Sequence, residues 1–64
     1  MLDAVSLADE ARDAGDWSRA AELYEAALER HPLRADLLVQ RGHALKESGR
    51  LAEAEASYRH ATEL

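Results

Sequence analysis

The 64-residue chain contains no cysteine, no phenylalanine and no isoleucine, and it has one proline and three glycines. Without cysteine, neither a disulfide framework nor a cysteine-ligated zinc site can stabilise so short a chain. Val5, Val39 and Thr62 are its only β-branched residues, and this scarcity disfavours a β-sheet. These absences favour an all-α fold in one domain.

Basic residues are also in the minority, with 8 Lys and Arg against 13 Asp and Glu, for a net charge of −5. Surfaces that bind nucleic acid or anionic membranes need clustered Lys and Arg, so we expect neither partner. No apolar stretch approaches the roughly 20 residues of a membrane span, and no basic-then-apolar leader precedes a cleavage site. We therefore expect a cytoplasmic protein.

Alanine and leucine supply most of the 47% of residues that are hydrophobic, and they recur at helical spacing. The chain breaks at Ala14-Gly15-Asp16, at His31-Pro32 and at Ser48-Gly49-Arg50. Asp16 or Ser18 is suited to cap the second helix. We predict helices over about 2–14, 18–31, 35–48 and 52–64. Their buried stripes are expected to comprise Ala4, Leu7, Ala8 and Ala11; Ala20, Leu23, Tyr24, Ala27 and Leu28; Leu38, Arg41, Gly42 and Leu45; and Ala54, Tyr58 and Ala61.

The two halves of the chain repeat at a spacing of 34 residues. A shift by 34 aligns 30 pairs, of which six are identical: Val5/Val39, Gly15/Gly49, Ala20/Ala54, Tyr24/Tyr58, Ala27/Ala61 and Glu29/Glu63. These identities include the turn glycine and an Ala-x3-Tyr-x2-Ala motif in the second helix of each half. A fixed 34-residue period of helical hairpins is typical of a repeat architecture.

The motifs resemble the tetratricopeptide repeat family, whose pattern is Trp-x2-Leu-Gly-x2-Tyr, then Ala-x3-Phe, then Pro. The strings AGDWSRAAELYEAALERHP and ESGRLAEAEASYRHA carry the resemblance. It implies two hairpins of antiparallel helices in a short right-handed α-solenoid, with repeat one at 1–34 and repeat two at 35–64. Arg41 and Thr62 depart from the apolar pattern. Arg41 is therefore expected to make part of the second repeat's core polar or to extend outward.

The resemblance also implies a non-enzymatic protein–protein interaction module. Its concave face would bind a protein or peptide through the first helix of each repeat. The expected lining residues are Val5, Ser6, Asp9, Arg12 and Asp13 from the first helix and Val39, Gln40, His43, Lys46 and Glu47 from the third. We expect no cofactor and no metal, because His43 and Glu47 have no second pair of ligands. No nucleophile, phosphate loop or catalytic set accompanies Asp9 and Asp13.

The last helix is expected to lack a neighbour that covers it. Its uncovered residues, Leu51, Ala54, Ala61 and Leu64, would then favour a homo-oligomer formed by stacking or helix swapping. An alternative is that the chain is the excised N-terminal region of a larger bacterial enzyme, such as a glycosyltransferase, in which it serves dimerisation or acceptor positioning. A designed repeat is a weaker alternative, since Arg41 and Thr62 are irregular.

We also expect structural roles for the aromatic residues. Trp17 should pack beneath the first turn rather than bind a ligand. Tyr24 and Tyr58 should fill the wider gaps between helices and keep their hydroxyls in water.

Overall fold

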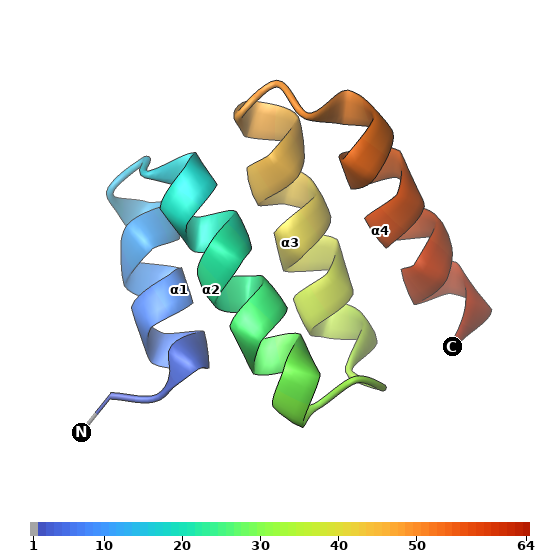
Figure 1. Cartoon of the computed structure of the whole chain (residues 1–64), viewed down its shortest axis with the longest axis horizontal. Helices are drawn as coiled ribbons and strands as arrows, with labels where there is room; N and C mark the ends of the chain where they lie inside the picture. The colour runs from blue at the N-terminus through green and yellow to red at the C-terminus, as the bar shows by residue number, and fades with distance from the viewer. Residues whose placement is uncertain (1) are drawn as a thin grey trace.

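The computed structural model describes residues 2–64 and contains four helices within them: α1 (Ala4–Asp13), α2 (Trp17–Arg30), α3 (Ala35–Glu47) and α4 (Leu51–Glu63). No strand occurs in this range, so the predicted all-α class is confirmed. Each helix begins and ends within two residues of its expected range. Consecutive helices are antiparallel and form a row in chain order (Figure 1).

Two glycine turns close the hairpins α1–α2 and α3–α4 in the same way. Gly15 and Gly49 adopt φ values of 75° and 87°, which is the left-handed region that glycine enters without steric cost. The backbone N–H of Asp16 then donates to the Ala11 carbonyl at 2.9 Å, and that of Arg50 to the Leu45 carbonyl at 2.8 Å. These bonds satisfy carbonyls at the helix ends and terminate α1 and α3.

Side-chain capping is found at one helix start. The Asp3 carboxylate accepts a 2.9 Å hydrogen bond from the Ser6 backbone N–H at the start of α1. Asp16 occupies the N-cap position of α2, but its side chain makes no capping hydrogen bond. The expected cap by Asp16 is therefore wrong: its backbone ψ of 75° differs from the extended 174° of Asp3.

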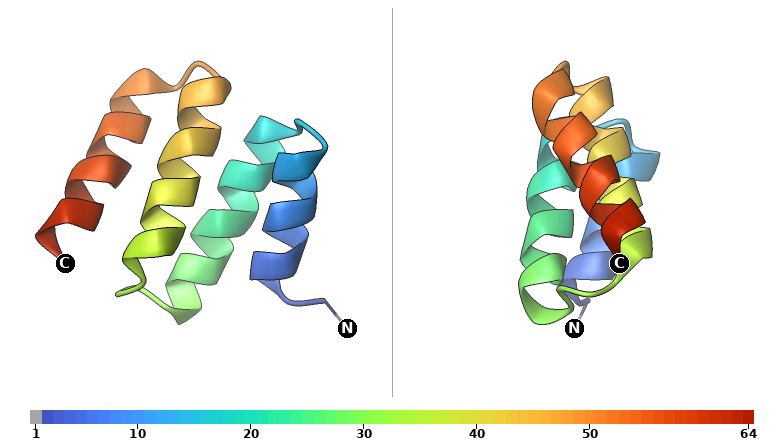
Figure 2. Two further views of the ribbon diagram at one scale, coloured as in Figure 1. Left: turned by 180° about the vertical axis from the view of Figure 1, so that it is seen from behind. Right: turned by 90° about the vertical axis from the view of Figure 1, so that its right-hand side faces the viewer.

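Each helix packs against the next one in sequence, and the molecule is a slab of 32 × 25 × 13 Å (Figure 2). Small side chains make up much of the interface between the helices. Ala8, Ala20 and Ala44 are fully buried, and Tyr24 and Leu45 are the largest side chains that are almost completely inaccessible. Alanines allow the helix backbones to approach closely, and the few large side chains fill the remaining space.

The α3–α4 hairpin has a glycine where the first hairpin has an alanine. The buried Gly42 faces the ring of Tyr58, and a Cβ atom at this position would lie 2.8 Å from the ring. The equivalent pair in the first hairpin is Ala8 and Tyr24, both fully buried. The absence of a side chain at Gly42 therefore permits Tyr58 to pack directly on the backbone of α3.

The uncovered surface of α4 is smaller than the sequence predicts. Ala54 is 3% exposed and belongs to the core, so its assignment to an open face is wrong. Leu51 and Leu64 are 63% and 52% exposed, and Ala61 is half-buried. The helical phase of Ala54 places it against α3, on the side opposite to solvent.

Candidate functional site

Two helices that are not adjacent in sequence are joined by a side-chain contact. Arg12 on α1 donates a 3.2 Å hydrogen bond from Nη1 to Oε1 of Gln40 on α3. The same guanidinium lies 3.4 Å from the Asp9 carboxylate, one helical turn earlier. Three of the residues predicted for the concave face are thus in contact. We call the surface formed by the side chains of α1 and α3 around them the α1–α3 face.

The hydroxyl of Tyr24 on α2 contacts both Asp9 and Arg12. It donates to Asp9 Oδ1 at 2.6 Å and accepts a 3.4 Å hydrogen bond from Arg12. The expectation of a hydrated hydroxyl is wrong for Tyr24, because the residue is fully buried. Burial, together with the hydrogen bond to Asp9, raises the pKa of Tyr24 to about 12. The phenol therefore stays protonated and acts as a donor at neutral pH.

Arg12 is the centre of the polar network formed by Asp9, Arg12, Tyr24 and Gln40. It also donates from Nε to Asp13 at 3.1 Å, and this hydrogen bond raises the pKa of Arg12. About a third of the Arg12 side chain remains exposed. A guanidinium held on several sides has lost much of its rotamer freedom before any ligand arrives. The network therefore presents a carboxylate, a guanidinium and an amide in fixed positions.

Five of the other residues predicted for this face lie outside the polar network. Val5 is half-buried and packs against the core, and Ser6 is half-buried at the start of α1. Val39 is 44% exposed. Lys46 and Glu47 are exposed and form no ion pair within residues 2–64.

An aromatic contact near this face was missed by the sequence reasoning. The half-buried Trp17 at the start of α2 packs edge to face on His43 of α3, with ring centroids 5.1 Å apart and an interplanar angle of 81°. Trp17 also packs against the core, but its contact with another helix goes beyond the expected position beneath the turn. No spacing in the sequence pairs residues 17 and 43.

Within residues 2–64, no three His, Asp or Glu side chains are grouped closely enough to hold a metal ion. None of the four helices combines the length and apolar content that crossing a bilayer would require.

Helical hairpins in tandem, closed by the same glycine turn, define a helical repeat protein. The family model described as tetratricopeptide repeat matches residues 5–64. The chain therefore belongs to the tetratricopeptide repeat family, whose members generally mediate protein–protein interactions and whose repeats are typically non-catalytic scaffolds. Comparison with the curated proteins and with the solved structures gave no match.

Proposed function

We propose that the chain is a non-enzymatic interaction module that binds a peptide segment of a partner protein across the α1–α3 face. The observation that carries the proposal is the Arg12–Gln40 hydrogen bond. This hydrogen bond joins side chains of both repeats into one continuous surface, so that a ligand can contact both hairpins at once.

The chemistry of this face suits a peptide backbone. The Asp9 carboxylate accepts hydrogen bonds, the Arg12 guanidinium donates them, and the Gln40 amide can do both. Asp9 and Arg12 keep 44% and 32% of their side-chain surface exposed. A bound peptide offers N–H donors and carbonyl acceptors along its length, and these groups complement the three side chains.

Neighbouring residues would add selectivity. Val39 is exposed and offers an apolar contact. Asp13, Lys46 and Glu47 supply charges of both signs at exposed positions. A ligand of mixed character, with an apolar side chain and both charge signs, fits this set better than a strongly acidic or basic one.

The experiment is selection of peptides from a random phage-displayed library on the immobilised wild-type protein. The affinity of each selected peptide is then measured by calorimetry for Arg12→Ala and for the matched control Arg19→Ala. Arg19 is exposed on α2 and forms no hydrogen bond or ion pair with the side chains of the network. We expect Arg12→Ala to weaken binding about tenfold, as for an interface anchor, and Arg19→Ala to leave it unchanged. Equal affinities for the two variants would overturn the proposal.

Self-association through α4 is a second candidate, favoured by the exposure of Leu51 and Leu64. Burial of these two side chains in a homodimer would remove apolar surface from water. Sedimentation equilibrium at micromolar concentration should show a dimer that Leu51→Asp dissociates. A monomer at every concentration would exclude this candidate and leave the peptide proposal standing.

A further inference from the structure

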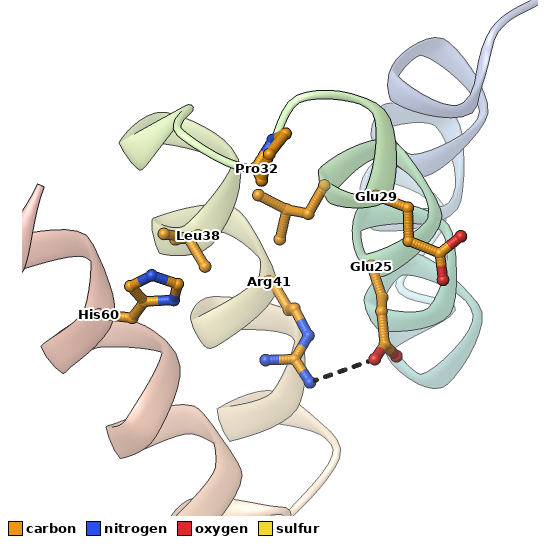
Figure 3. A pocket seen from close by; sticks show the side chains of 7 residues that line it. Glu25, Glu29, Pro32, Leu38, Arg41 and His60 are labelled. Carbon is orange, nitrogen blue, oxygen red and sulfur yellow. Dashed lines mark ion pairs between the residues drawn. The ribbon is translucent and has the colours of Figure 1, made fainter.

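A recess of about 320 Å³ opens between α2, α3 and α4 (Figure 3). None of the residues predicted for the α1–α3 face lines it. Its apolar part is formed by Leu28 at the end of α2, Pro32 in the following turn and Leu38 on α3. Leu38 is only 4% exposed and closes the bottom of the recess, so most of the apolar surface open to a ligand belongs to Leu28 and Pro32. A leucine-sized side chain bound here would bury apolar surface against the apolar floor of the recess.

Arg41 stands on one side of the recess, at the position that Leu7 occupies in the first repeat. Its side chain is 19% exposed, and the guanidinium points toward Glu25 at 3.9 Å (Figure 3). This distance is too long for a hydrogen bond, and the Arg41 guanidinium makes none to a protein group within residues 2–64. A guanidinium carries five N–H donors. No buried side-chain nitrogen in the described range lacks a partner, so the donors of Arg41 face solvent beside an apolar floor, where a ligand can reach them.

Glu25 and Glu29 form the opposite wall. They lie four residues apart on α2, where two like charges disfavour each other. Arg41 compensates Glu25, whereas Glu29 has no ion pair in the described part of the chain. His60 completes the recess from α4. Glu25, Glu29 and Arg41 together place two carboxylates and one guanidinium around the recess, and this excess of negative charge favours a cationic ligand group.

We propose that this recess binds a partner peptide in which a leucine-sized side chain adjoins a lysine or arginine. The apolar side chain contacts Leu28, Pro32 and Leu38, and the cation pairs with Glu29. Arg41 donates to a backbone carbonyl of the peptide. The site is separate from the α1–α3 face and does not depend on it, so the module would hold two different segments at once.

The test is a titration of the ¹⁵N-labelled protein with acetyl-Lys-Leu-Lys-amide, followed by NMR chemical shifts. We expect saturable shifts at millimolar concentration for the amides of Leu28, Glu29 and Arg41. Acetyl-Glu-Leu-Glu-amide and acetyl-Lys-Ser-Lys-amide should bind several-fold more weakly, because each lacks one of the two complementary groups. Equal binding of all three probes, or shifts elsewhere only, would overturn the proposal.

Variants separate binding from stability. Glu29→Lys should weaken the Lys-Leu-Lys probe about fivefold, whereas Glu10→Lys, which makes the same charge change on α1 outside the recess, should not. Arg41→Leu should weaken the probe while the unfolding midpoint is unchanged or raised. Loss of stability without loss of binding would show that Arg41 is only structural and would overturn its assigned role. If these results are not obtained, the proposal for the α1–α3 face still stands, because its test uses other residues and another ligand.

Discussion

The contact between Gly42 and Tyr58 predicts that the substitution Gly42→Ala lowers the free energy of unfolding. A Cβ added at Gly42 would lie 2.8 to 3.0 Å from three atoms of the Tyr58 ring. Carbon atoms at such distances overlap, so Gly42→Ala must displace the ring or the α4 helix that carries it. Since Tyr58 packs against the core, this displacement also loosens the α3–α4 interface.

Two effects of opposite sign contribute to the free energy of unfolding. Alanine is better than glycine inside a helix by about 1 kcal/mol. Overpacking of a close contact costs about 1–3 kcal/mol, so we expect a net destabilisation of about 1 kcal/mol. For a domain of this size, that change lowers the melting temperature by roughly 4–8 °C.

Thermal and urea unfolding followed by circular dichroism measures the effect, and a second background isolates its cause. In Tyr58→Leu the ring is gone, so Gly42→Ala should there raise stability by up to about 1 kcal/mol through helix propensity alone. The sign therefore reverses between the two backgrounds. If Gly42→Ala stabilises the protein by the same amount with and without the tyrosine ring, the overlap has no energetic consequence and the reasoning is refuted.

Three further predictions concern side-chain hydrogen bonds. Ser57 is buried on α4 and donates to the Leu38 carbonyl at 2.7 Å, so Ser57→Ala should cost about 1 kcal/mol in urea unfolding; no loss would contradict this role. The raised pKa of Tyr24 contributes stability that is present below about pH 10 and is lost as the pH rises toward 12. Absorbance titration should show a tyrosine step near pH 12 that is absent in Tyr24→Phe, and an unchanged titration would disprove the assignment. The hydrogen bond from the Ser6 backbone N–H lowers the pKa of Asp3, so this cap stabilises above pH 3.8 and fails as the pH falls further. The melting temperature of Asp3→Ala should therefore approach that of the wild type at low pH; a constant difference would argue against the cap.

Most of the fold is predictable from the sequence because it depends on local spacing. The alanines at 8, 20 and 54, the turn glycines and Pro32 determine which face of each helix is buried and where the chain reverses. The family resemblance is confirmed by the match over residues 5–64. Predicting these features requires only the local spacing of residues and the 34-residue repeat length.

The site depends on distances between helices, and the sequence does not contain them. Arg12 and Gln40 are 28 residues apart, and only the packing of α1, α2 and α3 brings them within 3.2 Å. The same packing buries the Tyr24 hydroxyl, which hairpin spacing alone leaves in water. Ser57 was also missed, because a polar residue inside α4 gives no sign of a carbonyl partner on α3.

The central claim is that the α1–α3 face is the ligand-binding surface of this module. The most direct measurement is NMR chemical-shift mapping of the ¹⁵N-labelled protein with the tightest peptide from the library selection. We expect the largest shifts at the amides of Asp9, Arg12 and Gln40, with the Gln40 side-chain amide among them. Shifts confined to α4 or to the recess beside Arg41 would contradict the claim.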